Sequence, residues 1–116
     1  MTTLEEYRRY LSQGKTNKYK NIKTEYNGVI YDSRKEATRA QELDLLLKAG
    51  IISNLQRQVS FPIVINGKKV FSYIADFVYT EKGKQVVEDV KGVKTAIFNL
   101  KKKCVEAEYG IEIIII

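Results

Sequence analysis

Two strand-like runs around one tight turn decide the fold, and they read FSYIADFVYTEKGKQVVEDVK at residues 71–91. β-branched and aromatic residues dominate both runs, as they do in strands. Lys82-Gly83 between the runs suits the turn of a β-hairpin. With a loop of two or four residues at this turn, Asp76 lies directly opposite Asp89, with their β-carbons about 4.5–5.5 Å apart.

The Glu88-Asp89 doublet leaves a choice of register. Strand side chains alternate between faces, so Lys91 shares the face of Asp89 while Glu88 points the other way. A three-residue loop at 81–83 would instead place Glu88 opposite Asp76. We prefer Asp89, because of the two acids only Asp89 shares a face with Lys91.

Outward from this hairpin, the sequence predicts a further strand before it, a helix on either side and a final strand. Ser33 caps the first helix, Glu36 completes a capping box and Gly50 ends it. Pro62 predicts that the first strand ends, bends or lies at an edge there. The expected class is α/β (α+β), a mixed sheet flanked by helices. Its elements are a helix at 34–49, strands at 55–65, 68–80 and 84–91, a helix at 95–109 capped by Thr95, and a strand at 111–116.

Each helix is expected to bury one stripe of apolar residues. In the first helix Glu36 lies in line with the stripe, so a carboxylate is expected at the buried face. In the second, Cys104 lies on the stripe and is expected to be an inert small hydrophobe. The stripes are Glu36, Ala40, Leu43 and Leu47, and Val93, Ile97, Leu100, Cys104 and Ala107.

Residues 1–32 are expected to form an accessory segment in front of a core at 33–116. Thr3 and Glu6 form a capping box for a short helix over 3–12. Three lysines mark 13–20 as a basic linker, and Asn27-Gly28 suits a small hairpin. Tyr19 in the linker could stack on bases, although a mobile basic tail is the simpler interpretation.

Composition narrows the class of protein. The 116 residues suit one domain, and their 20 Lys and Arg against 14 Asp and Glu give a net charge of +6, which favours polyanion partners, nucleic acid above all. The chain has no His and one Cys, which argues against most zinc sites, His-based catalysis and disulfides. With no secretory signal and no long apolar run, we expect a soluble, cytoplasmic protein.

Two directly opposed carboxylates are unfavourable in a plain sheet. At 4 Å their repulsion is on the order of 4 kcal/mol with an effective dielectric constant near 20. A divalent cation removes the conflict, because Mg²⁺ binds carboxylate oxygens and can also hold a phosphate oxygen. Lys91 would orient water or neutralise charge on the phosphate. An inward-facing Glu36 would supply a third oxygen ligand or fix a metal-bound water.

Simpler interpretations exist for each of these residues. Glu36 could act solely as the capping partner of Ser33, although both roles are compatible at the helix start. Asp89 and Lys91 could form an ordinary ion pair on an exposed strand face. The opposed Asp76 favours a joint site over the ion pair.

This constellation resembles the PD-(D/E)XK nuclease superfamily. Asp76, then Asp89-Val90-Lys91, behind a helix that bears Glu36, is similar to its motif, and the order α-β-β-β-α-β is similar to its restriction-endonuclease-like core. Ala75 stands where the name has Pro. From about Lys18 onward the chain also resembles small phage and prophage proteins found among replication and recombination genes. The phrases that carry this likeness are Tyr31-Asp32-Ser33-Arg34-Lys35-Glu36-Ala37, Tyr73-Ile74-Ala75-Asp76-Phe77 and Val87-Glu88-Asp89-Val90-Lys91-Gly92.

The resemblance implies a role for each site residue. Asp76 and Asp89 would be metal ligands with the backbone carbonyl of Val90, Lys91 the catalytic lysine and Glu36 the helix carboxylate. The implied activity is Mg²⁺- or Mn²⁺-dependent cleavage of duplex or branched DNA, such as a Holliday junction, by a homodimer. The alternative is a DNA-binding or partner-binding module of a phage replication or recombination complex that does not cut.

Basic side chains near the predicted site form a candidate rim for DNA phosphates. Each phosphate neutralised would add about 0.9 to the log–log salt slope of duplex binding. For any single lysine, a solvated helix face is the simpler interpretation. The candidates are Arg34, Lys35, Arg39, Lys94, Lys101, Lys102 and Lys103.

Overall fold

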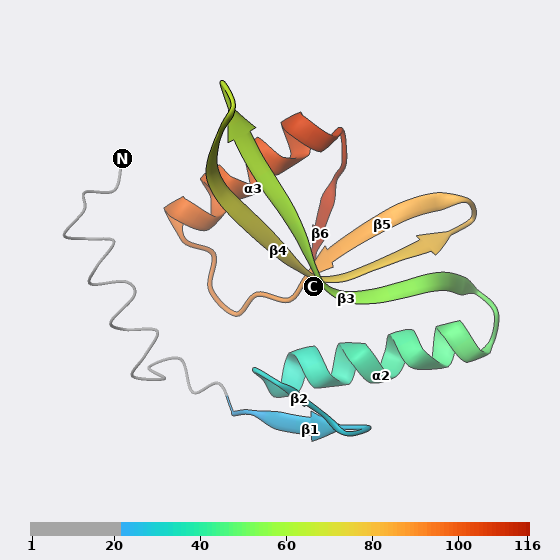
Figure 1. The fold of residues 1–116 in the computed structure, drawn as a ribbon. Coiled ribbons are helices and arrows are strands. Elements are labelled where there is room, and N and C mark those ends of the chain that lie inside the picture. The colour runs from blue at the N-terminus through green and yellow to red at the C-terminus, as the bar shows by residue number, and fades with distance from the viewer. Residues whose placement is uncertain (1–21) are drawn as a thin grey trace.

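The computed structural model describes residues 22–116 and follows the predicted order of elements (Figure 1). The expected helix at 3–12, the linker at 13–20 and Tyr19 lie outside the described residues. The α/β (α+β) class is confirmed. The elements are β1 (Thr24–Tyr26), β2 (Val29–Tyr31), α2 (Arg34–Lys48), β3 (Ile52–Ile65), β4 (Lys68–Glu81), β5 (Lys84–Asp89), α3 (Ala96–Tyr109) and β6 (Ile113–Ile115).

The main sheet is mixed and has four strands in the order β3-β4-β5-β6. β3 pairs antiparallel with β4, and β4 antiparallel with β5, whereas β6 runs parallel to β5. β1 and β2 form the separate small hairpin that Asn27-Gly28 predicts. Pro62 lies in β3, an edge strand of the sheet, as expected.

The hairpin turns set the strand registers. In Asn27-Gly28, Asn66-Gly67 and Lys82-Gly83 both residues have positive φ, the conformation of a type I′ turn. Beyond Lys82-Gly83, β4 and β5 pair from Glu81 with Lys84 to Phe77 with Glu88. This is the register of a two-residue loop, so the three-residue alternative is wrong.

β3 departs from regular strand geometry at Gln58, which lies opposite Asp76 between the pairs Arg57–Phe77 and Val59–Ala75. Gln58 has φ 53, a left-handed backbone conformation that is uncommon outside glycine. Asn54, four residues earlier in the same strand, has the same φ. Residues two apart in a regular strand share a face, yet Ala75 packs in one hydrophobic cluster and Phe77 in another. Asp76 therefore lies at the point where the side chains of β4 switch from packing in one hydrophobic cluster to packing in the other.

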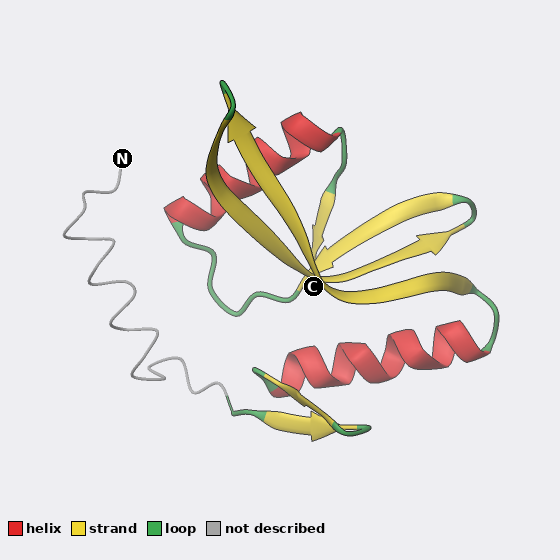
Figure 2. Cartoon of the chain, viewed as in Figure 1, coloured by secondary structure: helices red, strands yellow, loops and turns green. Residues whose placement is uncertain are grey.

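The two helices lie on either side of the sheet (Figure 2), and one hydrophobic cluster lies between each helix and the sheet. One holds Leu43 of α2 with Phe77 and Tyr79 of β4. The other holds Phe98 and Val105 of α3 with further sheet residues. Neither helix of the described chain is long and apolar enough to cross a lipid bilayer.

The helix ends match the sequence, but the buried faces match only in part. Ser33 and Thr95 cap α2 and α3 by accepting hydrogen bonds from amides three residues on, and Gly110 ends α3 in the left-handed conformation. In α2, Leu47 of the predicted stripe is exposed. In α3 the predicted stripe matches only in part, since Cys104 packs against the core as expected but Leu100 is 64% exposed, and the buried residues are Phe98 and Val105.

Candidate active site

The end of β5 brings the two central carboxylates together. The last β4–β5 pair joins Phe77 to Glu88, so the next positions are Asp76 and Asp89. The amide of Val90 donates a hydrogen bond of 2.8 Å to Oδ2 of Asp76. The register that the sequence predicts is thus present at the site, and Asp76 is fixed to the strand that carries Asp89.

Asp89 is a buried acid with an unusual set of neighbours. Its side chain accepts a hydrogen bond from the Tyr73 hydroxyl, and Nζ of Lys91 lies 3.7 Å away. Burial raises the pKa of Asp89 to about 7, and Asp76 adds to the rise while Tyr73 and Lys91 oppose it. Asp89 is 1% exposed, so the interpretation as a pair on an exposed strand face is wrong.

Glu36 comes to the same region from the first turn of α2. Its amide donates to Ser33, so it does take part in the N-cap, and its own side chain is buried. Burial raises the pKa of Glu36 to about 7, and the charges of Asp76 and Asp32 add to the rise. Arg57 of β3 partly offsets this effect, with its guanidinium 4.0 Å from Oε1.

Lys91 lies beside the acids and against an aromatic ring. Its ammonium is 4.8 Å from the centroid of Phe98, a distance at which a cation is attracted to the ring face. Its carbonyl faces Nζ of Lys35 at 3.5 Å. The ring of Phe98 and the carboxylate of Asp89 hold the ammonium at this end of the sheet.

The acids fit a hard divalent cation as partial ligands. Within residues 22–116, no three Asp, Glu or Cys side chains are close enough to enclose an ion by themselves. Mg²⁺, however, is usually held by one or two carboxylates, with water and substrate phosphate completing its shell. Asp76 and Asp89 match that donor set, with the carbonyl of Val90 as a further oxygen. Glu36 fits better as a base that orients water than as a direct ligand.

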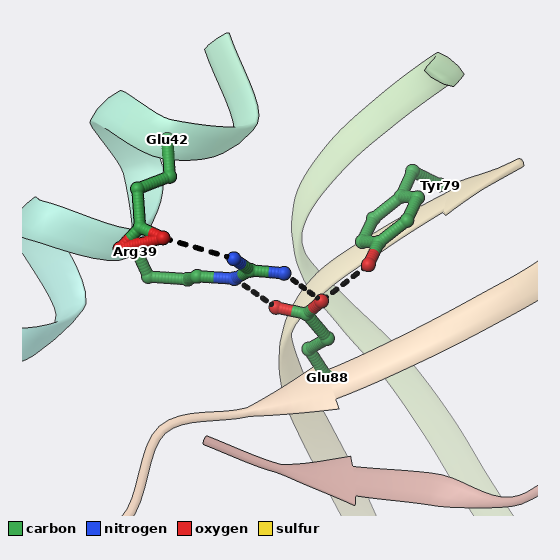
Figure 3. A network of polar contacts seen from close by, with 4 residues as sticks. All are labelled: Arg39, Glu42, Tyr79 and Glu88. Atoms are coloured by element: carbon green, nitrogen blue, oxygen red, sulfur yellow. Dashed lines mark hydrogen bonds and ion pairs between the residues drawn. The ribbon is translucent and has the colours of Figure 1, made fainter. Parts of the chain in front are cut away.

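The other acid of the doublet has a separate environment on the α2 side (Figure 3). Glu88 accepts two hydrogen bonds from Arg39, at 2.8 and 2.6 Å, and one from the Tyr79 hydroxyl. Burial and the bond to Glu88 raise the pKa of Tyr79 to about 12. All these contacts lie on the face away from Lys91, as alternation along β5 predicts.

The candidate DNA rim divides into exposed cations and cations that contact other side chains. Arg39 differs from the expectation, because Glu88 and Glu42 occupy its guanidinium. Lys102 pairs with Glu106 at 3.1 Å, and the ammonium of Lys101 lies 5.4 Å from the ring centre of Phe71. The remaining candidates are exposed, namely Arg34, Lys35, Lys94 and Lys103.

Comparison with known proteins gives a family. Residues 16–113 match a family described as "Protein of unknown function (DUF1064)". The chain belongs to this family. The matched span includes Glu36, Asp76, Asp89 and Lys91. No curated protein matches the chain, and no solved structure does.

Three residues of the site in this DUF1064 chain escape sequence reasoning. Arg57 stacks on Tyr31, 4.4 Å from the ring centroid, beside Glu36. Gln58 donates to Oδ1 of Asp76 at 3.3 Å, and Tyr73 donates to Asp89. Arg57 and Gln58 lie in a strand that pairs with β4, so the spacing of polar residues in β3 is a signal that could have found them.

Proposed function

We propose that this protein hydrolyses phosphodiester bonds in DNA, with Mg²⁺ or Mn²⁺ as cofactor. The observation that carries the proposal is the pairing of Asp76 with Asp89 at one end of the sheet, with the Lys91 ammonium 3.7 Å from Asp89. Two facing carboxylates, a lysine and a third acid on a neighbouring helix are a donor set for metal-assisted phosphate chemistry.

Each side chain has a role that follows from its position. The Val90 amide and Gln58 orient Asp76, and the Tyr73 hydroxyl orients Asp89, so the carboxylate groups are held in fixed directions with further lone pairs for a cation. A divalent cation held there would polarise a phosphate oxygen and lower the pKa of bound water. The Lys91 ammonium would neutralise charge that develops on the phosphate.

Glu36 is suited to proton transfer. Its pKa of about 7 lies near neutral pH, where a general base is most effective. The carboxylate would accept a proton from a water that faces the phosphate. Arg57 beside it supplies a positive charge that keeps part of the Glu36 population ionised.

The proposal extends to the substrate and the assembly. The net charge of +6 and exposed Arg34, Lys35, Lys94 and Lys103 favour a polyanion. The likeness to phage replication and recombination proteins suggests branched DNA such as a Holliday junction, in the host cytoplasm. Two cuts on a symmetrical junction call for a homodimer.

Cleavage of DNA tests the proposal directly. Supercoiled plasmid and a labelled four-way junction are incubated with the protein and Mg²⁺, Mn²⁺ or EDTA. We expect cutting with either metal, none in EDTA and none with Asp89→Asn. The matched control is Glu112→Gln, an exposed acid next to β6, which should cut like the wild type.

A second candidate function has one observation in its favour. Asp89 is already satisfied by the Tyr73 hydroxyl and the nearby Lys91 ammonium, which is compatible with a DNA-binding or partner-binding module that cuts nothing. In that case the junction would be bound equally well in EDTA and in Mg²⁺. Binding without cleavage under all metal conditions would favour this module over the enzyme.

A further inference from the structure

The Arg39–Glu88 contact joins α2 to the centre of the sheet. Glu88 is 1% exposed, and Arg39 binds both of its carboxylate oxygens while the Tyr79 hydroxyl binds one of them (Figure 3). The third guanidinium nitrogen of Arg39, Nη1, donates to Glu42 on the same helix at 3.2 Å. The guanidinium thus has a fixed position and a fixed orientation.

Stability alone does not explain a charged pair at this place. The surrounding α2 contacts are apolar, and they include Ala40, Leu43 and Phe77. Replacing a buried ion pair by apolar side chains of similar size is often neutral or stabilising, because the desolvation cost of the charges disappears. Apolar contacts, however, tolerate sliding and rotation of a helix more readily than a two-bond fork does.

The pair occupies positions directly linked to the candidate site. Arg39 follows Glu36 by three residues, so the two side chains lie on adjacent turns of one helix face. Glu88 precedes Asp89 in β5. A shift or rotation of α2 along the sheet therefore moves Glu36 relative to Asp76 and Asp89 unless the Arg39–Glu88 bonds prevent it.

We propose that Arg39 and Glu88 are positioning residues, which lock α2 in the register that holds Glu36 on the side of Asp76. This inference rests on the proposed nuclease function. Neither residue belongs to the proposed set of metal ligands. In the described part of the chain, the fork of Arg39 supplies side-chain hydrogen bonds between α2 and the four-stranded sheet, whereas the contact of Arg57 with Glu36 is longer, at 4.0 Å.

The test separates positioning from stability. The double variant Arg39→Met with Glu88→Leu replaces the pair by apolar side chains of similar volume, and Glu42→Gln removes the outer partner of Arg39 as the matched control. We expect the double variant, made in a Tyr79→Phe background so that no buried hydroxyl loses its partner, to keep its melting temperature within a few degrees. Its kcat for DNA at saturating Mn²⁺ should fall about 10–100-fold, the usual loss when supporting contacts of a metal site are removed, with KM unchanged.

A second measurement does not depend on activity. Spin labels at Gln41→Cys in α2 and Gln85→Cys in β5, in a Cys104→Ser background, report the helix-to-sheet distance by pulsed electron spin resonance. We expect a narrow distribution in the wild type and the Glu42→Gln control, and a broader or shifted one in the double variant.

Each outcome decides. An unchanged distance distribution overturns the positioning role, and so does wild-type kcat in the double variant. The single variant Arg39→Lys keeps a positive charge beside Glu88 and should retain more kcat than the double variant. If Arg39→Lys loses as much kcat as the double variant and both have lowered melting temperatures, the pair has a general structural role instead. If the wild type neither cuts nor binds Mn²⁺ while the distances behave as expected, the nuclease proposal fails, and the pair is a helix-docking contact with no role in catalysis.

Discussion

The backbone amide of Val90 donates a hydrogen bond of 2.8 Å to Oδ2 of Asp76, across the open end of the β4–β5 hairpin. The bond joins an acid on one strand to the residue that follows Asp89 on the next. It therefore anchors the Asp76 carboxylate to the main chain beside Asp89. The relation explains how two acids that repel each other stay side by side.

Asp76→Asn should abolish metal-dependent DNA cleavage while the fold persists. Asparagine keeps an oxygen that can accept from the Val90 amide, so the hairpin end is retained, but it loses the charge that attracts a cation. The measurement is Mn²⁺ affinity by titration calorimetry, beside cleavage of plasmid. Wild-type Mn²⁺ affinity in this variant would contradict the metal site.

Lys91→Ala should lower kcat by about 10²–10⁴-fold, the range for loss of a group that stabilises or transfers charge in the transition state. Mn²⁺ affinity should not fall, because the ammonium is no ligand and its removal relieves repulsion of the ion. Lys84→Ala, an exposed lysine at the far end of β5, is the control. Loss of cleavage in both variants would point to general DNA attraction and away from the site.

The metal-free protein should be more stable at pH 5 than at pH 8. Burial, with Asp76 nearby, raises the pKa values of Asp89 and Glu36 to about 7, whereas in an unfolded chain they are about 4. Between these values the folded state holds protons that the unfolded state releases, so the free energy of unfolding falls as pH rises. Thermal melts in EDTA measure this, and Asp89→Asn should flatten the profile. A melting temperature that climbs from pH 5 to pH 8 would exclude the assignment.

Arg57→Ala should move the acid limb of the cleavage profile to higher pH. The guanidinium lowers the pKa of Glu36, so its loss leaves more of the carboxyl protonated at neutral pH and slows proton acceptance. Arg57→Lys should shift the limb less, since the charge remains. The pH dependence of kcat between pH 5.5 and 9 is the measurement, and an unchanged limb in Arg57→Ala would remove Glu36 from the role of base.

Leu43→Ala should destabilise the protein by about 2–5 kcal/mol, the usual cost of truncating a buried leucine. Leu43 is fully buried between α2 and the sheet, whereas Leu45 on the outer face is 67% exposed. Leu45→Ala, the control, should change the free energy of unfolding by about 0.5 kcal/mol or less. Urea denaturation of both variants compares the two faces, and equal losses would contradict the packing of α2.

Much of the site geometry follows from the sequence, because local chemistry fixes it. Lys82-Gly83 adopts a two-residue turn, and the alternation of β5 then separates Asp89 from Glu88. The metal, the DNA substrate and the nuclease activity stay predictions. Turn and alternation patterns do not predict side-chain pairing between elements that are distant in the sequence. From the sequence alone Arg39 is therefore indistinguishable from an exposed basic residue, whereas in the structure it binds Glu88.

The buried face of α3 shows a second reason for failure. Counting apolar residues selects Leu100 and Val93, both exposed. The helix instead packs through Phe98 and Val105, and the half-buried Lys101 extends over Phe71. A lysine stem covers apolar surface while its charge stays in water. A count that treats lysine as fully polar therefore predicts the wrong buried face for the helix.

The free edge of β3 bears on aggregation of the protein in concentrated solution. Asn54 and Gln58 turn the backbone out of extended geometry, and Pro62 has no amide hydrogen. These interruptions fall at every fourth residue, so no long row of free amides and carbonyls is offered to a neighbouring molecule. Within the described residues β3 forms a sheet edge fourteen residues long, and we expect these interruptions to reduce its pairing with the edge of a neighbouring molecule.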